Sequence, residues 1–316
     1  MKLIEVCAPG LLTTVQDLGR DGFGPMGVSA SGAADSVSLR IGNRLVGNAA
    51  TAAALEMTLL GGTFHFPDGG VIALAGSDFG AKLDHVPVEL WTSVAVKHGQ
   101  TLQLGATKSG ARCYLCVHGG IDVKPFLGSA STHLLSGLGG VAGRALRKGD
   151  VLKIAAAKEA FRTFRKKRLA PGGLEKSKLR KVLRVTAGPQ SDWFPEAVQK
   201  IFYESTYRVA EESNRMGIRL EGAPLLGTET GEMISEGVSL GAVQITAGGL
   251  PIILFVEQQT TGGYPKIANV ISADLHALGQ LRPRDEIRFA RVDLETARAL
   301  FLEQERWLSA RHLILE

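Results

Sequence analysis

The chain of 316 residues is 45% hydrophobic and 21% charged, with a net charge of +5 and three cysteines. This composition is that of an ordinary soluble globular protein, and the length fits two domains better than one. An odd cysteine count without an export signal argues against a disulfide framework. A glutamate within residues 1–7 interrupts the apolar run that a secretory leader needs, so we expect a cytoplasmic protein.

Three helices are predicted along the chain. The first covers residues 35–45, where Val37, Ile41 and Leu45 share one face and Asp35 stands ahead of them as a capping residue. A second helix is expected to begin at residues 191–195, with Pro195 in its first turn. A third covers 293–313, and its apolar face is formed by Leu294, Ala297 and Phe301.

The segment 111–118 has the pattern of a strand and carries the C-x-x-C pair Cys113 and Cys116. Residues three apart on a strand point to opposite faces, so neither a shared zinc ion nor a redox pair is expected. The seven histidines show no metal-binding spacing, and we predict no metal site in the protein itself. The uncharged run 237–256 is interrupted by glycines and a proline, which indicates strands and a turn rather than a membrane span.

The positive charge comes from one segment, residues 158–181. It holds ten Lys or Arg against two Glu, a local charge of +8, which leaves 5 − 8 = −3 for the rest of the chain. Because the segment also contains Pro and Gly, we interpret it as a solvated basic linker between two domains. It lacks the interleaved aromatic residues or a known motif for nucleic-acid binding, so no nucleic acid is expected as a partner.

The two halves of the chain resemble each other. Residues 146–154 match 281–289, and each copy follows an apolar strand that runs into Gly-Gly. Short strands with Gly-rich turns favour a mainly β fold built by duplication. We therefore predict two β-barrel domains with a few packing helices: the first over 1–157, the basic linker over 158–181, and the second over 182–316 with a C-terminal helix.

The loop 255–268 concentrates directed polar groups after a buried strand. It contains a carboxylate, two amides and two hydroxyls, followed by Gly262 and Gly263, which allow backbone N–H groups to approach a ligand. Pro265 extends Tyr264 and sets the direction of that side chain. The alternative interpretation is a polar hairpin turn that only connects two strands.

Several motifs together resemble the allophanate hydrolase subunit 2 family, which includes KipA, one component of bacterial 5-oxoprolinase and one half of the urea carboxylase carboxyltransferase domain. The motifs lie at 10–20, 31–35, 119–129, 213–217, 241–244 and 259–265. The resemblance implies cyclophilin-like β-barrels, a KipI-like partner (the B component of 5-oxoprolinase) and a ring-opening A component. The family usually has Asp where Glu257 stands, and the basic linker is not part of its pattern.

The family's substrates share an amide N–C=O group, and a primary amide side chain both donates and accepts hydrogen bonds. We therefore expect a substrate site in the second half of the chain. The expected binding residues are Asn214, Gln244, Gln259, Thr260, Thr261, Gly262, Gly263 and Tyr264. Contributors from the first half would be Gln16, Asp17 and Arg20.

Four residues are expected to carry the chemistry. Arg215 and Lys266 would stabilise charge on the lactam oxygen and the phosphoryl group. Glu257 or Asp274 would accept a proton or hold magnesium. The structural alternatives are a turn held by Asn214 and Arg215, and a solvated Lys266.

Resemblance to 5-oxoprolinase implies ATP with Mg²⁺ in the complex, although residues 137–143 form only a loose Gly-rich loop without the end of a Walker A motif. No internal Met-Lys-Met marks a biotin attachment site. We predict a subunit, inactive alone, of an ATP-dependent 5-oxoprolinase that converts 5-oxo-L-proline to L-glutamate. The alternatives are a KipA-like regulatory protein that antagonises a KipI-type histidine-kinase inhibitor, and half of a urea or amide carboxyltransferase.

Overall fold

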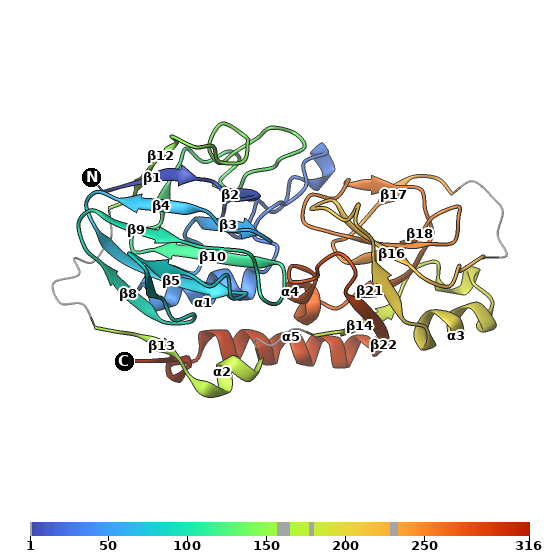
Figure 1. Cartoon of the computed structure of the whole chain (residues 1–316). Helices are drawn as coiled ribbons and strands as arrows, with labels where there is room; N and C mark the ends of the chain where they lie inside the picture. Colours follow the sequence, from blue (N-terminus) through green and yellow to red (C-terminus); the bar gives the residue numbers. More distant parts are fainter. Residues whose placement is uncertain (1, 157–164, 177–179, 228–232) are drawn as a thin grey trace. The chain divides into compact units, whose positions relative to one another are not determined.

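The computed structural model describes residues 2–156, 165–176, 180–227 and 233–316 (Figure 1). The chain divides into two compact units. Unit 1 comprises Met1–Arg20, Ser31–Lys178 and Leu308–Glu316, and unit 2 comprises Asp21–Ala30 and Leu179–Trp307. The last nine residues of the chain therefore belong with unit 1, in contrast to the division expected from the sequence.

Unit 1 contains two large antiparallel sheets. The seven-stranded sheet has the order β11-β12-β1-β4-β9-β6-β7, and the five-stranded sheet has the order β2-β3-β10-β5-β8. The strands are β1 Lys2–Ala8, β2 Leu12–Gln16, β3 Ala54–Thr58, β4 Thr63–Phe66, β5 Gly70–Gly76, β6 Lys82–Leu83, β7 Val86–Pro87, β8 Ser93–Val96, β9 Gln100–Gln103, β10 Arg112–Val117, β11 Ile121–Asp122 and β12 Val151–Ile154.

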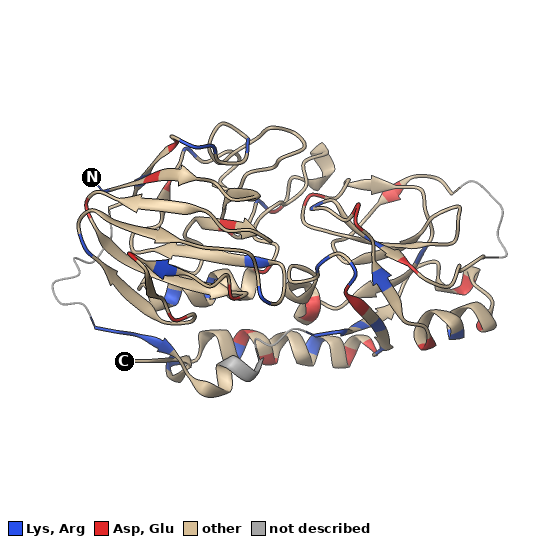
Figure 2. Ribbon diagram, in the orientation of Figure 1, with Lys and Arg blue, Asp and Glu red and all other residues tan. Residues whose placement is uncertain are grey.

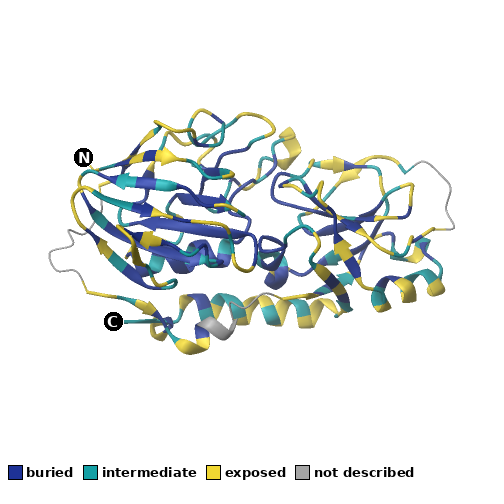
Figure 3. Ribbon diagram, viewed as in Figure 1, coloured by how far each residue is buried: buried dark blue, intermediate teal, exposed yellow. Residues whose placement is uncertain are grey.

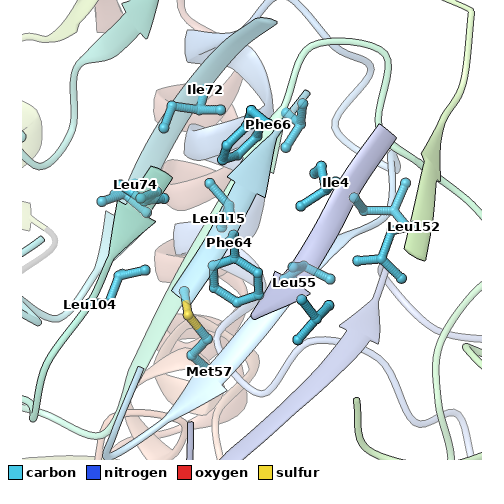
Figure 4. Close-up of a cluster of buried hydrophobic side chains, with 14 of the residues drawn as sticks. Ile4, Leu55, Met57, Phe64, Phe66, Ile72, Leu74, Leu104, Leu115 and Leu152 are labelled. Atoms are coloured by element: carbon cyan, nitrogen blue, oxygen red, sulfur yellow. The ribbon is translucent and has the colours of Figure 1, made fainter. Parts of the chain in front are cut away.

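The inner faces of these two sheets share one hydrophobic core (Figure 4). Ile4 and Phe64 come from the larger sheet, Leu55 and Leu115 come from the smaller one, and all four are fully buried. On β12 the exposed and buried residues alternate, as the period of a half-buried strand requires. The loops of unit 1 connect the strands of this two-sheet core.

Helix α1 (Ser36–Leu45) covers the outer face of the five-stranded sheet, against β5 and β10. The carboxylate of Asp35 accepts a hydrogen bond from the backbone N–H of Ser38 at 2.9 Å, which satisfies one of the free donors of the first turn. The predicted apolar face is buried. Both the helix and its capping residue are therefore confirmed.

The two cysteines of β10 lie on opposite faces of their strand, as predicted. Cys113 belongs to the core between the sheets. The Sγ atom of Cys116 lies 3.8 Å from the carbonyl oxygen of Leu39 in α1. The side chains therefore cannot meet.

Thiol reactivity provides a test of this placement. Burial raises the pKa of both Cys113 and Cys116 well above the usual range, so neither forms a thiolate near neutral pH. Cys7 is exposed. We expect Ellman's reagent at pH 8 to titrate one thiol in the folded chain and three after denaturation. Rapid reaction of two or three thiols in the folded state would contradict the burial of β10.

Unit 2 is built on a closed barrel in the order β14-β21-β18-β19-β16-β15-β22. Its strands are β14 Val182–Ala187, β15 Tyr207–Val209, β16 Gly217–Glu221, β18 Ala242–Ile245, β19 Pro251–Leu254, β21 Lys266–Val270 and β22 Glu286–Arg291. Strands β17 (Glu236–Gly237) and β20 (Thr261–Gly262) form a separate two-stranded sheet. The predicted mainly β fold is confirmed. The barrel closes in unit 2, whereas the strands of unit 1 form two large sheets and the two-stranded sheet of β13 (Arg168–Leu169) and β23 (Ile314–Leu315).

The remaining elements are short except for α5 (Leu294–Ser309). They are η1 Gly24–Met26, β13 Arg168–Leu169, α2 Pro171–Lys176, η2 Ser191–Trp193, α3 Glu196–Glu204, η3 Ser272–Asp274, α4 Leu275–Leu278, η4 Arg311–Leu313 and β23 Ile314–Leu315. Pro195 is the N-cap of α3 rather than part of its first turn. No helix in these described ranges is both long and apolar enough to cross a bilayer.

The predicted apolar face of the C-terminal helix is not buried. Leu294 is 75% exposed and Phe301 39% exposed, and exposed residues recur along α5 (Figure 3). The helix ends at Ser309, and the chain then enters β23, which pairs with β13. Part of the predicted basic linker lies outside the described residues. The described part is not a fully solvated linker, because Arg168–Leu169 forms strand β13. This region is rich in Lys and Arg (Figure 2).

Candidate functional site

A cluster of polar residues in unit 2 combines strands β18 and β21 of the barrel with the separate sheet of β17 and β20. We call it the amide cluster and define it as Gln190, Glu236, Gln244, Gln259, Gly262 and Lys266. Strands β18 and β21 place Gln244 directly opposite Lys266, and strands β17 and β20 place Glu236 directly opposite Gly262. Directly opposed residues project to the same side of a sheet, so each pair of strands directs both of its residues to one side.

A β-bulge creates the pairing of Gln244 with Lys266. Val243 pairs with Ala268, yet the next residue, Gln244, pairs with Lys266, so Ile267 is the extra residue of β21. Such a bulge redirects a side chain that strict alternation would place elsewhere. As a result, a buried amide and a buried ammonium lie side by side.

Gly262 leaves room for the amide of Gln244. A Cβ atom at position 262 would lie 2.5 Å from Nε2 of Gln244, 3.2 Å from Cγ1 of Val238 and 3.5 Å from Nε2 of Gln259. The sequence prediction places Arg215, Gln244 and Gln259 in one pocket, and this geometry brings the amides of Gln244 and Gln259 together at Gly262. The glycine is needed here for its lack of a side chain and not for a left-handed backbone.

The Nε2 atom of Gln244 is buried and has no hydrogen-bond partner among the residues that the structure describes. A buried donor that remains unpaired costs about 1–3 kcal/mol, and native proteins contain few of them. A ligand with a carbonyl oxygen would satisfy this donor. The unpaired amide is therefore the strongest indication that a small molecule binds at the amide cluster.

Lys266, Glu236 and Gln190 are linked to one another by polar contacts. The Nζ atom of Lys266 pairs with Oε1 of Glu236, and the same oxygen accepts a hydrogen bond from Nε2 of Gln190 at 3.0 Å. The backbone N–H of Lys266 donates to Oε1 of Gln190 at 3.1 Å. The hydrogen bonds from Lys266 and Gln190 lower the pKa of Glu236, so this carboxylate stays ionised at neutral pH.

Arg215 and Glu257 form a buried ion pair at the base of the polar loop. The Nε atom of Arg215 lies 2.5 Å from Oε1 of Glu257, and both side chains are at most 5% exposed. The backbone N–H of Glu257 also donates to the carbonyl oxygen of Arg215 at 2.8 Å. Each charge thus neutralises the other, and the pair joins the chain before β16 to the chain after β19.

Asp274 lies away from the amide cluster. Lys266 begins β21, which extends roughly 13 Å to Val270, and Asp274 lies beyond that end of the strand. The carboxylate is fully buried and accepts hydrogen bonds from the backbone and side chain of Arg184 at 2.5–2.9 Å. The structure therefore does not bring Asp274 to the expected site and gives it a structural ion pair instead.

The other predicted binding residues make backbone contacts or are partly exposed to solvent. The carbonyl oxygen of Thr260 accepts a hydrogen bond from the backbone of Val238, and Thr261 is part of β20. Tyr264 is 45% exposed. Asn214 accepts a hydrogen bond from the backbone of Met216 at 2.8 Å, which supports its alternative role in a turn.

Gly263 continues the chain directly after β20. A Cβ atom there would lie 3.2 Å from the carbonyl oxygen of Met233, so this glycine passes close to neighbouring backbone. Sequence reasoning missed two members of the amide cluster, Gln190 and Glu236. Gln190 lies in the segment 185–192, which resembles 71–78 of the first half, whereas no pattern marks Glu236.

The three predicted contributors from the first half belong to a separate network in unit 1. All three contact the segment 129–132. The carboxylate of Asp17 accepts hydrogen bonds from two hydroxyls and one backbone amide of this segment at 2.5–2.7 Å. Gln16 and Arg20 donate to its carbonyl oxygens at 3.1 and 2.5 Å. These contacts fix the loop that follows β11.

Comparison with known families gives a match over most of the chain. Residues 26–291 match the family described as carboxyltransferase domain, subdomain A and B. Among relatives, the C subunit of 5-oxoprolinase from Escherichia coli is 40% identical over 306 residues, which cover 96% of both chains. The protein of the same name from Haemophilus influenzae is 37% identical and covers 99% of both chains.

Larger proteins contain a region similar to this chain. Urea amidolyase of Lachancea kluyveri is 36% identical over 95% of this chain, which corresponds to 17% of that relative. The crystal structure of Kluyveromyces lactis urea amidolyase superposes with a TM-score of 0.91 at 32% identity. It covers 99% of this chain, and this chain spans 21% of the yeast protein.

Proposed function

Because this chain belongs to the carboxyltransferase domain family, subdomains A and B, we propose that it is the lactam-binding subunit of a 5-oxoprolinase-type enzyme. Family membership confirms the resemblance predicted from the sequence. The observation that carries the proposal is the buried, unpaired Nε2 atom of Gln244 beside Gly262. The full-length similarity to the C subunits of two bacterial 5-oxoprolinases supports it.

The amide cluster suits the N–C=O group of a lactam. Nε2 of Gln244 donates to the carbonyl oxygen, where negative charge develops when the amide is activated. The amide of Gln259, whose Nε2 atom also lies close to Gly262, provides a second group that both donates and accepts. The backbone of Gln244 is held in strand β18, which places the base of its side chain at the site.

The expected magnesium ligands do not fit that ion in this structure. Glu257 is paired with Arg215, and Asp274 is paired with Arg184, so both carboxylates are already neutralised. Magnesium binds carboxylates that offer their oxygens to it, often together with substrate phosphates. We therefore assign no step of ATP chemistry to these two residues.

The proposed enzyme is a complex. Both bacterial relatives are named as the C subunit of 5-oxoprolinase, and a lettered subunit is one component of several. In our proposal the other components are the KipI-like B component and the ring-opening A component, which act with ATP and Mg²⁺ on 5-oxo-L-proline. This chain contributes the site that binds the lactam.

Reconstitution tests the proposal. We expect no 5-oxoproline-dependent ATP hydrolysis by this chain alone, and turnover when it is mixed with the KipI-like and ring-opening components from the same genome. The control mixture omits this chain. Full turnover without it, or full turnover by this chain alone, would refute the proposed role.

The second candidate is one half of a urea or amide carboxyltransferase, and the similarity to urea amidolyase favours it. Urea presents the same N–C=O edge to Gln244. An assay distinguishes the two candidate functions. It uses urea in place of 5-oxoproline, and a biotin carboxylase with its biotin carrier in place of the ring-opening component. Carboxylation of urea without any turnover of 5-oxoproline would select this second function.

A further inference from the structure

Two buried donors of the amide cluster converge on a single carboxylate oxygen. Nζ of Lys266 and Nε2 of Gln190 both contact Oε1 of Glu236. The side chain of Lys266 is 4% exposed, whereas that of Glu236 is 45% exposed. The donors thus belong to the interior of unit 2, and the acceptor comes from β17, a strand of two residues.

We propose that this position is the binding site for a substrate carboxylate, and that Glu236 occupies it until the substrate displaces it. The substrate class is then an amide that carries a carboxylate, such as 5-oxoproline, rather than a neutral amide such as urea. This inference rests on the proposed lactam-binding function. It also changes the role expected for Lys266, from stabilising the lactam oxygen to binding the carboxylate.

Gln244 and Lys266 stand on neighbouring strands, as the two polar groups of such a molecule require. Gln244 and Lys266 are directly opposed on β18 and β21, and opposed residues have Cβ atoms about 5 Å apart on the same face. In 5-oxoproline the carboxylate is attached to the ring carbon next to the lactam nitrogen. One molecule therefore presents a carbonyl oxygen to Gln244 and a carboxylate to Lys266.

The charges favour exchange of one carboxylate for another. A buried ammonium needs an anion beside it, so a neutral ligand cannot take the place of Glu236 without leaving Lys266 unpaired. A ligand carboxylate keeps the pair intact. Glu236 is already half in solvent, so it regains water when it leaves.

Gln190 makes the site ready for the incoming carboxylate. Its Oε1 atom accepts a hydrogen bond from the backbone N–H of Lys266, which directs its Nε2 atom toward the position of the carboxylate oxygen. This contact does not involve Glu236, so it persists when Glu236 leaves. The Nε2 donor of Gln190 therefore stays in position during the exchange.

The test compares two ligands that differ only in the carboxylate. The full chain is titrated by calorimetry with 5-oxo-L-proline and with 2-pyrrolidinone. In Glu236→Gln the internal competitor has lost its charge, so we expect the affinity for 5-oxoproline to rise by about 3- to 10-fold, because a larger fraction of the chain is competent to bind. The affinity for 2-pyrrolidinone should remain within twofold.

Two further variants complete the design. Gln190→Ala removes one donor to the carboxylate and should weaken 5-oxoproline binding by about 10-fold, again without effect on 2-pyrrolidinone. Glu221→Gln is the matched control, because Glu221 is a half-exposed carboxylate paired with Arg208 elsewhere in unit 2. It should change neither affinity.

Three results would overturn the inference: weaker or unchanged binding of 5-oxoproline to Glu236→Gln, equal effects on both ligands, or no binding of either ligand to any variant. Failure of the proposed reaction is distinguishable from these. If the carboxylate selectivity holds but the reconstituted mixture does not hydrolyse ATP with 5-oxoproline, the reaction is wrong and the binding site stands.

Discussion

Replacing Gly262 by alanine is expected to lower turnover of 5-oxoproline in the reconstituted complex by ~10²-fold or more, because a small displacement of a fixed contact has effects of this size. The new Cβ atom would lie 2.5 Å from Nε2 of Gln244. The simplest relief is rotation of the Gln244 side chain, which moves the donor away from the substrate. The fold should survive, because the end of the Gln244 side chain can rotate and Val238 has to shift only slightly.

The control for this experiment lies in the same two-stranded sheet. Gly237 is the other glycine of that sheet, and a Cβ atom there would meet nothing within 4 Å. Gly237→Ala should therefore leave turnover and lactam affinity unchanged. If Gly262→Ala keeps turnover within twofold of the unmodified complex, the amide of Gln244 does not bind the substrate.

Replacing Arg215 by alanine is expected to destabilise the chain by about 3–5 kcal/mol, because the carboxylate of Glu257 would remain buried without its partner. Urea-induced unfolding of the isolated chain measures this effect. From the sequence alone, Arg215 was expected to stabilise charge on the lactam oxygen and the phosphoryl group. The buried ion pair changes that expectation.

Two comparisons isolate the buried charge as the cause. Arg208 forms an exposed pair with Glu221, so Arg208→Ala should cost only about 0–1 kcal/mol. Removing both charges, with Arg215→Met and Glu257→Leu together, should recover most of the stability. Unchanged stability of Arg215→Ala together with lost turnover would instead show that Arg215 contacts the substrate.

The sequence predicted those features that depend on local patterns. The capped helix after Asp35 follows from the spacing of its apolar residues, and the opposite placement of Cys113 and Cys116 follows from strand alternation. The convergence of Gln244 with the loop at Gly262 was expected from their polar character and from the family resemblance. Each of these predictions used information contained within one short segment or one motif.

The rest depends on how strands pair, which no local pattern reveals. The bulge after Val243 shifts the partner of Gln244 by one residue, and a one-residue shift exchanges the two faces of a strand. Asp274 is near Lys266 in sequence, but β21 carries it away. Glu236 reaches Lys266 from a strand of two residues, which is too short to produce a periodic signal.

The pairing of β13 with β23 has a consequence for how the chain is made. Arg168 pairs with Leu315, and the side chain of Arg44 in α1 donates hydrogen bonds to the carbonyl oxygens of Leu308 and Ala310. Unit 1 therefore gains its last strand only after the ribosome has translated all of unit 2. During synthesis, Arg168 and Leu169 of β13 therefore pair with β23 only when the last residues of the chain have been translated. A fragment that ends at residue 178 lacks β23.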